Sequence, residues 1–494
     1  MTIGKAHSAM KSGDFSAVDL AQAYLDVIAE KNKNLNAYLE VFTDVIEQAK
    51  SADAIFASAR ASISSSKLTA LTGIPLAIKD NILIKGRTVS SASKMLEKYR
   101  ATYDATAIER LKKAGAVFLG RTNMDEFALG GSTEKSAFGV TKNPHDPSRV
   151  PGGTSGGSAA AVASLMALAA LGSDTGGSIR QPSAFCGVVG LKPTYGAVSR
   201  SGLMAAVSSF DQIGPIAKNV SDAEIIFDII HGKDPLDGTT ITAEGTAEDT
   251  YHPKRLGSAS GTKKPVIGIP REFLKQGGIH KDILASVASS IEKYKKLGYE
   301  VKDIDLPNAK YCLPVYYILN FAEVSSNLSR FDGVRYGLHT DGTTGIDDYF
   351  ETRATGFGRE TRRRILLGTY VLSSGYYDAY YNRANALRRT ITADFDTAFK
   401  KVDIIMTPTT PTPAWKIGEK SHDPVAMYLE DIFTVSVNLT GLPAMSVPVG
   451  CAEVSSGKDG KNGMVSLPVG IQLTARHGDE KTLFEAGKDL LGEK

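Results

Sequence analysis

The chain has 494 residues, of which 42% are hydrophobic and 22% charged, and its formal net charge is +3. These values are typical of a globular protein with a large core, and they argue against a disordered chain and against a basic nucleic-acid-binding face. The three cysteines, Cys186, Cys312 and Cys451, are too few and too widely spaced for a disulfide framework or a thiolate metal site. We therefore expect a cytoplasmic protein that holds no metal.

The first 60 residues are predicted to be helical. Ser16 followed by Asp19 is typical of a helix N-terminus. The next apolar residues recur at the spacing of one helix face: Leu20, Tyr24, Val27 and Ile28. Residues 1–15 contain no apolar segment of the length that a signal peptide needs. We expect residues 1–60 to pack, as a helical part, on a catalytic body formed by residues 61–494, the two together making one large domain.

An apolar run of strand length within Gly73–Asn81 ends at Lys79. Such a strand would carry the lysine amine to an interior position. Burial disfavours the ammonium form and lowers a lysine pKa, so that the neutral amine can accept a proton near neutral pH. The alternative interpretation is a surface turn in which Lys79 pairs with Asp80.

Two glycine-flanked hydroxyl clusters follow, at Pro151–Ser158 and Gly172–Ser178. Dense glycine lets backbone N–H groups converge on one point, which suits an anion or a developing oxyanion. The first cluster lacks the Lys-Ser/Thr ending of a phosphate loop, and it runs into the apolar segment Ala159–Leu171, for which we predict a closely packed helix. The 13 residues of that segment are too few to span a bilayer.

Ser178, at the end of the second cluster, is a candidate nucleophile if a base is supplied from elsewhere in the chain. The candidate oxyanion donors are the backbone amides of Thr175, Gly176, Gly177 and Ser178. The alternative is a glycine-rich turn that carries a surface serine.

The rest of the chain alternates between helical and strand-like segments. We predict helices at Ala107–Ala114 and Ile283–Leu297, and strands at Ala116–Leu119, Val266–Ile269, Tyr299–Ile304, Val402–Met406 and Val469–Leu473. This alternation predicts an α/β fold. The polar stretch Gly232–Pro265 is predicted to be an exposed excursion.

Three of these segments, Gly73–Asn81, Pro151–Ser158 and Gly172–Pro182, together resemble the motifs of the amidase signature family. The resemblance implies a mixed central β-sheet with helices on both faces. It also implies a catalytic triad of the Lys–Ser–Ser type, in which the middle residue has a cis peptide bond.

On this resemblance Lys79 is the base, Thr154 the bridging hydroxyl and Ser178 the nucleophile. The chain departs from the family pattern at Thr154, where serine is usual. Threonine keeps the hydroxyl, but its methyl group restricts rotation about χ1. The neighbouring Ser155 is the alternative bridge.

Further segments resemble the A-subunit family of tRNA-dependent amidotransferases: Phe185–Gly196, Ser209–Pro215, Leu367–Tyr381, Asp423–Asp431 and Asn438–Pro443. The resemblance covers nearly the whole chain and implies a glutamine site formed by Arg364 and Asp431. A guanidinium can hold an α-carboxylate with two hydrogen bonds, and a carboxylate can accept from an α-ammonium. Arg363 is the alternative to Arg364.

The same resemblance implies a glutaminase that hydrolyses glutamine and passes ammonia to a B subunit. That partner would use ATP and Mg²⁺ to activate Glu-tRNA(Gln) or Asp-tRNA(Asn), a C subunit would hold the heterotrimer together, and tRNA would bind mainly to the B subunit. The chain itself would then need no cofactor and no membrane. The alternatives are a free-standing amidase of another small amide and a non-catalytic scaffold subunit.

Overall fold

A computed structural model of the chain describes residues 1–61, 68–241, 264–275, 278–456 and 463–493. Most of the predicted excursion Gly232–Pro265, from residue 242 to 263, lies outside the described residues. The α-helices are α1 Ile3–Ser12, α2 Ala17–Leu35, α3 Val45–Arg60, α4 Thr106–Lys113, α5 Gly156–Ala163, α6 Arg180–Cys186, α7 Val220–Ile230, α8 Arg271–Leu274, α9 Lys281–Lys296, α10 Cys312–Asn327, α11 Gly345–Gly356, α12 Arg359–Leu372, α13 Arg383–Phe399, α14 Pro424–Tyr428, α15 Val435–Thr440 and α16 Glu480–Leu491.

The strands are β1 Tyr38–Val41, β2 Pro75–Lys79, β3 Val117–Thr122, β4 Ala169–Asp174, β5 Val189–Lys192, β6 Gln212–Ala217, β7 Ile267–Ile269, β8 Val301–Asp303, β9 Ile404–Pro408, β10 Ala444–Ser455 and β11 Met464–Ala475. Short 3-10 turns occur at η1 Lys94–Leu96, η2 Glu126–Ala128, η3 Ala309–Tyr311, η4 Leu328–Arg330 and η6 Leu429–Asp431, and a π-helix at η5 Tyr377–Asn382. The predicted helices at Ala107–Ala114 and Ile283–Leu297 are confirmed as α4 and α9, and the five predicted strands as β3, β7, β8, β9 and β11, with shifts of a few residues at their ends.

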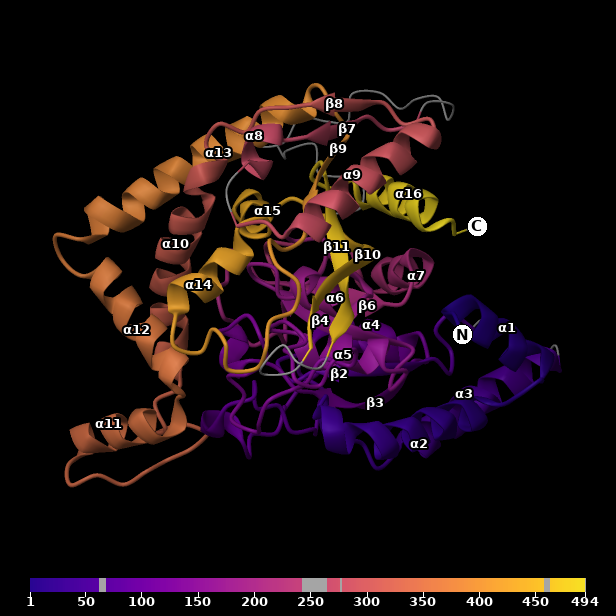
Figure 1. Ribbon diagram of the computed structural model, residues 1–494. Coiled ribbons are helices and arrows are strands. Elements are labelled where there is room, and N and C mark those ends of the chain that lie inside the picture. Colours follow the sequence, from indigo (N-terminus) through magenta and orange to yellow (C-terminus); the bar gives the residue numbers. More distant parts are fainter. Residues whose placement is uncertain (62–67, 242–263, 276–277, 457–462, 494) are drawn as a thin grey trace.

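The described strands form one 11-stranded sheet in the order β1-β3-β2-β4-β6-β5-β10-β11-β9-β7-β8. Strand β2 runs parallel to β3 and β4, and β7 runs parallel to β8 and β9, whereas the other neighbours are antiparallel. Helices α7, α9 and α16 lie on one side of this sheet, and α10, α12 and α13 lie on the other (Figure 1). The predicted α/β fold with a mixed sheet is confirmed.

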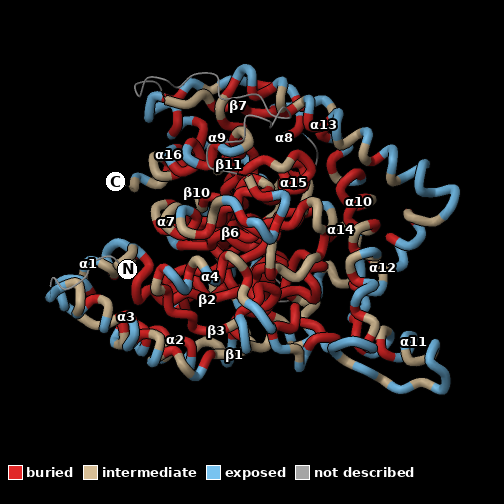
Figure 2. Tube along the Cα trace, turned by 180° about the vertical axis from the view of Figure 1, so that it is seen from behind, coloured by how far each residue is buried: buried red, intermediate tan, exposed pale blue. Residues whose placement is uncertain are grey.

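Burial is greatest where the sheet passes through the middle of the molecule, and the outer helices alternate between buried and exposed residues (Figure 2). Strands β2, β4 and β6 are buried along their whole length, as strands covered on both faces must be. None of the helices in the described ranges combines the length and the apolar character that a membrane crossing needs.

The N-terminal part is helical, as predicted, but it also supplies an edge strand to the sheet. Ser16 caps α2, and its side chain and that of Asp19 form a reciprocal capping box. Strand β1 then pairs with β3 at the edge of the sheet. Apolar side chains of α1, α2 and α3 belong to the same buried cluster as those of the central strands. We propose on this ground that the chain folds as one large domain.

The prediction of one helix over Ala159–Leu171 was wrong. Helix α5 covers only its first residues and ends at Ala163, where Leu165 adopts a left-handed conformation with φ of 65°. Strand β4 then begins at Ala169. Because nearly every residue of this segment is apolar, its sequence shows neither a helical nor a strand period, and the pattern could not separate the two.

Candidate active site

The predicted site residues come together where the parallel strands β2 and β4 end. Lys79 is the last residue of β2, and Ser173 and Asp174 are the last two of β4. Adjacent parallel strands present their carboxyl ends at one edge of the sheet, where α/β proteins usually bind their ligands. The loop after β4 leads to Ser178 and then to α6, and the first glycine cluster leads into α5.

The Lys79 side chain is fully buried and contacts three hydroxyl groups. Its Nζ donates to Thr154 Oγ1 at 2.7 Å, to Ser155 Oγ at 2.8 Å and to Ser173 Oγ at 2.9 Å. The Ser173 carbonyl oxygen lies 3.2 Å from the same nitrogen. No described carboxylate forms an ion pair with it. A buried amine among hydroxyls can therefore exchange protons with them, which the surface-turn alternative would not allow.

Burial lowers the pKa of Lys79 to about 7, against the opposing effect of the more distant carboxylates of Asp125, Asp174 and Asp211. A neutral amine has two N–H donors and one lone pair. Because four oxygens surround Nζ, at least one hydroxyl can donate to that lone pair when the amine is neutral. This geometry holds Lys79 ready to act as a base.

The two candidate bridging hydroxyls, those of Thr154 and Ser155, differ in their other hydrogen-bond partners. Ser155 Oγ also donates to the Ser173 carbonyl oxygen at 3.1 Å, which commits its proton to strand β4. Thr154 Oγ1 has no hydrogen-bond partner except Lys79 among the described residues, so its proton remains available to a further acceptor. The peptide bond between Gly153 and Thr154 is cis, at the position that the family resemblance implied. The arrangement favours Thr154 over Ser155 as the bridge.

Ser178 lies in the loop between β4 and α6, and it keeps 7% of its surface exposed, whereas Lys79 and Thr154 are fully buried. Its carbonyl oxygen accepts from the amide of Ser155 at 3.0 Å, which ties the two glycine-rich loops together. The Ser178 hydroxyl itself has no hydrogen-bond partner among the described residues. A ligand entering the site would therefore meet this hydroxyl first.

Of the four predicted oxyanion donors, Gly177 requires a correction. Its amide donates to Asp174 Oδ1 at 2.9 Å and so serves the loop instead of a ligand. The amides of Thr175, Gly176 and Ser178 have no acceptor among the described residues. Side chains leave no room for a Cβ at Gly176, where the Tyr316 hydroxyl packs directly over the backbone.

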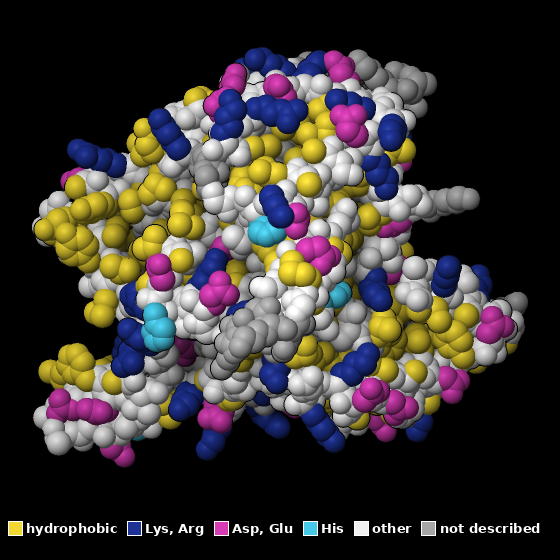
Figure 3. Space-filling model, in the orientation of Figure 1, with side chains coloured by type: hydrophobic (Ala, Val, Ile, Leu, Met, Phe, Trp, Pro, Cys, Tyr) yellow, Lys and Arg dark blue, Asp and Glu magenta, His cyan; other side chains and the backbone are white. Residues whose placement is uncertain are grey.

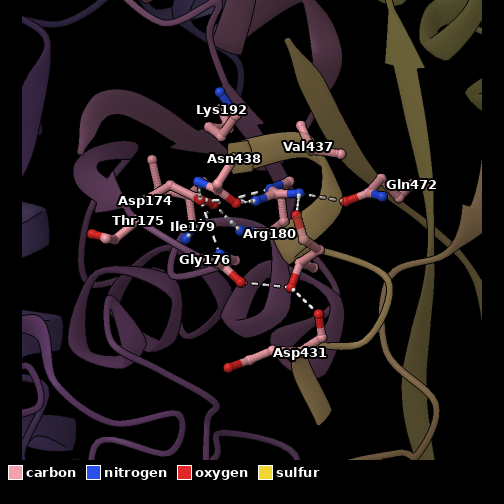
Figure 4. A network of polar contacts seen from close by, with 12 residues as sticks. Asp174, Thr175, Gly176, Ile179, Arg180, Lys192, Asp431, Val437, Asn438 and Gln472 are labelled. Atoms are coloured by element: carbon pink, nitrogen blue, oxygen red, sulfur yellow. Dashed lines mark hydrogen bonds and ion pairs between the residues drawn. The ribbon is translucent and has the colours of Figure 1, made fainter. Parts of the chain in front are cut away.

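A buried charge pair, which sequence reasoning did not identify, holds this loop in place (Figure 4). Arg180 Nη2 lies 2.8 Å from Asp174 Oδ1, and Arg180 Nη1 donates to Gln472 at 2.6 Å. Asn438 Nδ2 donates to Asp174 Oδ1 at 3.0 Å. Burial alone would raise the pKa of Asp174, but the Arg180 guanidinium holds that pKa well below its usual range. Asp174 therefore stays ionised and orients the amides around Ser178.

Arg364 and Asp431 both lie near a stacked tyrosine pair. Tyr317 and Tyr428 stack with their ring centroids 4.1 Å apart. The Arg364 guanidinium lies 5.6 Å and 5.4 Å from the centroids of these two rings, and the Tyr317 hydroxyl donates to Asp431 Oδ2 at 2.6 Å. Glu360 accepts from Arg364 Nε at 2.9 Å. A guanidinium and a carboxyl group thus lie beside the same tyrosine pair.

The charge states of the two groups follow from their surroundings. Burial alone would lower the pKa of Arg364, but the adjacent Glu360 raises it above its ordinary value, so the guanidinium is always charged. Burial raises the pKa of Asp431 to about 7, against the opposing effects of Tyr317 and Arg364. Arg363, the alternative to Arg364, points outward: its side chain is 30% exposed and pairs with the other oxygen of Glu360.

Two chains of contacts connect this charged region to the loop that carries Ser178. Thr434 Oγ1 donates to the Gly176 carbonyl oxygen at 2.6 Å and lies 3.1 Å from the carbonyl oxygen of Asp431 (Figure 4). On the other side Arg364 Nη1 donates to Asn320 at 3.2 Å, and Asn320 Nδ2 donates to the Tyr316 hydroxyl at 3.2 Å. The charged region and the loop of Ser178 are therefore connected through side-chain and backbone contacts. Tyr317, Glu360 and Asn320 carried no sequence signal that could have identified them.

No group of three or more His, Cys, Asp or Glu side chains within the described ranges is arranged to hold a metal ion. The described residues bring near one another a partly accessible serine hydroxyl, a buried amine, three backbone amides without acceptors, and an arginine and an aspartate side chain.

Comparison with known proteins agrees with these features. The family model described as Amidase matches residues 19–484. The A subunit of the glutamyl-tRNA(Gln) amidotransferase of Ruminiclostridium cellulolyticum is 47% identical over 495 residues, which cover 100% of this chain and 97% of that protein. The protein of the same name from Roseiflexus castenholzii is 49% identical, over 99% of this chain and 94% of the relative.

Solved structures of known proteins share the fold, and two of them illustrate the similarity. The crystal structure of the A subunit of the glutamyl-tRNA(Gln) amidotransferase from Thermotoga maritima matches with a TM-score of 0.76 and 38% identity, and covers 99% of this chain and 94% of that one. The native peptide amidase from Stenotrophomonas maltophilia matches with a TM-score of 0.79 and 28% identity, and covers 100% and 96% of the two chains.

Proposed function

The chain belongs to the amidase family, and from that premise we propose that it is the glutaminase subunit of a tRNA-dependent amidotransferase. The observation that carries this proposal is the pair formed by the buried Arg364 and the half-buried Asp431, beside the loop of Ser178. A hydrolase of simple amides needs no such pair, because its substrates have no free α-carboxylate and α-ammonium to bind.

In this function Arg364 holds the α-carboxylate of glutamine and Asp431 the α-ammonium. The guanidinium keeps one nitrogen, Nη2, without a partner among the described residues, and the aromatic rings around it exclude water. A charge-assisted hydrogen bond in such a setting is about twice as strong as a neutral one. The side-chain amide of the bound glutamine would then extend toward Ser178.

The proposed reaction starts when the Ser178 hydroxyl attacks the side-chain amide carbon of glutamine. Its proton passes to Thr154 while the Thr154 proton passes to the neutral amine of Lys79. The negative charge that develops on the carbonyl oxygen is stabilised by the amides of Thr175, Gly176 and Ser178, each good donor contributing about 2.7–4 kcal/mol.

The tetrahedral intermediate then collapses. Lys79 returns the proton through Thr154 to the leaving nitrogen, the C–N bond breaks and ammonia leaves. Water attacks the glutamyl ester on Ser178 and gives its proton to Lys79. The ester C–O bond then breaks, glutamate leaves, and Lys79 returns its proton through Thr154 to the Ser178 oxygen, so that each turnover restores the site and consumes one glutamine and one water.

The partners belong to the same proposal. The relatives are named as subunits, which supports an assembly of several chains. We propose that a B subunit receives the ammonia, uses ATP and Mg²⁺ to activate the glutamyl or aspartyl group on tRNA and binds most of that tRNA, that a C subunit joins the two, and that the complex works in the cytoplasm. This chain would hold no cofactor.

Ammonia release from glutamine, measured with and without the B and C subunits, tests the function. We expect release that depends on glutamine and that exceeds release from simple amides such as propionamide. Turnover of simple amides with inert glutamine would instead make the chain a free-standing amidase. Glutamine-dependent amidation of tRNA that continued without any ammonia release by this chain would make it a scaffold.

Arg364→Lys is expected to raise KM for glutamine by about 10- to 100-fold with a smaller change in kcat. Lysine keeps the charge but loses the planar fork and its contact with the tyrosine rings. Steady-state ammonia release measures both constants. The matched control is Arg363→Lys, which changes a half-exposed ion pair and should move KM by less than about threefold. Equal effects of the two substitutions would reject the assignment of Arg364.

Thr154→Val is expected to lower kcat by about 10²- to 10³-fold, because valine has the shape of threonine but no hydroxyl to carry the proton. Thr154→Ser should keep most of the activity, and Ser155→Ala should cost less than about tenfold because the Ser155 proton is directed to Ser173. Single-turnover release of ammonia separates this step from product release. A larger loss in Ser155→Ala than in Thr154→Val would transfer the bridging role to Ser155.

A further inference from the structure

The hairpin formed by α12, η5 and α13 exposes an unusual amount of apolar and aromatic surface. In it, Leu366 is 71% exposed and Tyr370 47% exposed. Four further side chains on the same hairpin are between 38% and 42% exposed: Leu367, Tyr376, Tyr377 and Tyr380. This hairpin projects from the side of the molecule opposite the N-terminal helices, and the space-filling view shows a hydrophobic surface at its tip (Figures 1 and 3). We call these six residues the hairpin patch.

The composition of the hairpin separates it from an ordinary surface. Residues 365–382 include five tyrosines but only one charged residue, Asp378. Depletion of charge and enrichment in tyrosine distinguish the buried core of protein–protein interfaces from the rest of a protein surface. The rings are also in contact with one another before any partner binds, since the ring centroids of Tyr370 and Tyr376 lie 4.3 Å apart with the planes tilted by 36°. A partner would therefore lose little side-chain freedom when it covers them.

Around this apolar centre the charge is strongly positive. Residues 359–389 contain seven arginines and two carboxylates, a net charge of +5, although the whole chain has only +3. Four exposed arginines on the two helices of the hairpin form no ion pair with a described residue: Arg359 and Arg362 on α12, and Arg383 and Arg389 on α13. The hairpin thus has the side-chain distribution of a protein–protein interface, with an apolar centre and a cationic rim.

The same rim continues into a cleft of about 520 Å³ between α11 and α12. Lys94, Lys135 and Arg359 line it, and its two carboxylates already have partners: Glu126 accepts from Thr361, and Glu360 pairs with arginine. Beyond the cleft, α11 exposes a second apolar pair, Ile346 at 69% and Phe350 at 67%. Figures 1 and 2 both show α11 and the hairpin projecting from the same side.

We infer that the hairpin patch is the surface on which another protein subunit of the amidotransferase docks, and that this subunit presents an apolar area bordered by carboxylates. The inference rests on the proposed function, because the assembly is what supplies such a partner. A second copy of this chain fits poorly, since a twofold contact would bring two cationic rims together. Nucleic acid and anionic lipid fit poorly as well, because residues 365–382, which would form the centre of the contact, include no cation and one carboxylate, Asp378.

Docking at this place would act directly on the glutamine site. Helix α12 carries Arg364 on its buried face and Leu366 and Tyr370 on its exposed face. At Gly368 the helix packs so closely on the backbone of α10 that a Cβ would collide with the Phe321 carbonyl oxygen. A partner that covers the exposed face therefore fixes the helix that holds the substrate carboxylate.

The test compares the full chain with the variant Leu366→Ser/Tyr370→Ser/Tyr376→Ser, each mixed with the B and C subunits of the same organism. We expect the apparent Kd for assembly, followed by light scattering after gel filtration, to rise by roughly 30-fold or more in the variant. The thermal unfolding midpoint and its increase on adding glutamine should not change, because the substituted side chains are exposed. Charge reversal by Arg383→Glu/Arg389→Glu should weaken assembly further at low salt. The matched control is Tyr103→Ser/Leu236→Ser, which replaces side chains of comparable exposure elsewhere.

Assembly of the triple variant at the wild-type Kd would overturn the inference and leave the proposed function intact, provided that glutamine still raises the unfolding midpoint. The inference would fail in the same way if the patch instead supported self-association, binding to bulk tRNA or binding to vesicles that contain phosphatidylserine. If the wild-type chain neither responds to glutamine nor assembles with the two subunits, the proposed function fails and the inference fails with it.

Discussion

Ser178→Ala should reduce ammonia release from glutamine by on the order of 10⁴-fold or more, the largest effect that we expect from any single substitution. Removal of the nucleophile leaves only the catalysis that the oxyanion donors and substrate binding supply without a covalent intermediate. The change takes one oxygen from a side chain that keeps 7% of its surface exposed and donates to no described residue. The folded structure should therefore be little affected.

Three measurements make this expectation specific. Glutamine should still raise the unfolding midpoint of Ser178→Ala, because Arg364 and Asp431 remain. Mass spectrometry of the wild-type chain quenched during turnover should find glutamyl on the peptide that contains Ser178, and the variant should lack it. Ser183→Ala is the matched control: this buried serine of α6 only donates to the Ile179 carbonyl oxygen at 2.7 Å. Activity of Ser178→Ala within tenfold of the wild type would refute the nucleophile.

The residues that could be predicted from the sequence are those whose signal is local. Lys79 ends a short apolar run, and a strand that is buried throughout must bury its last side chain with the rest. The two glycine clusters mark loops where backbone amides face one point, and the structure joins them through the Ser155 amide and the Ser178 carbonyl oxygen. The local sequence was therefore sufficient to predict that Lys79 ends a buried strand and that the two glycine clusters form loops.

The parts that could not be predicted depend on contacts between distant segments. Arg180 binds Asn438, which is 258 residues away, and Gln472, which is 292 residues away. In the sequence Arg180 is one more arginine after a glycine-rich loop. Only the fold shows that it neutralises Asp174 and that Asp174 consumes the Gly177 amide. The same holds for Tyr317, whose contact with Asp431 spans 114 residues.

In the glycine-rich loop around Ser178, some groups hold the loop in place and others are available to a ligand, and the sequence alone does not distinguish the two. Asp174 and Arg180 are fully buried, fully paired and positioned to hold the loop, whereas the amides on either side of Gly177 remain without acceptors in the described part of the chain. A charge pair that is satisfied within the fold gives a rigid support, and the unsatisfied donors beside it are the ones that a ligand can use. What a glycine-rich loop can bind therefore depends on which of its amides the protein itself already occupies.

Lys79→Met should lower kcat for glutamine by about 10²- to 10⁴-fold, the range that loss of a positioned general base produces. Methionine fills nearly the same volume and takes no charge into the interior, so the variant should remain folded. The wild-type pH profile should identify the same group. Below its pKa of about 7 the amine is protonated and cannot accept the serine proton, and kcat should fall about tenfold per pH unit on the acidic side and level off on the basic side.

The ionisation of Asp431, also near pH 7, must be kept apart from that of Lys79. Asp431 binds the substrate, so its protonation should raise KM, and bound glutamine should lower its pKa by placing an ammonium beside it. At saturating glutamine, the fall of kcat on the acidic side of the pH profile (the acidic limb) then depends on the ionisation of Lys79 alone. Lys79→Met should lose that limb and keep the pH dependence of KM, whereas Asp431→Asn should keep the limb and raise KM. If the acidic limb of kcat persisted unchanged in Lys79→Met, some other group would be the base, because no other buried amine contacts Thr154 in the described part of the chain.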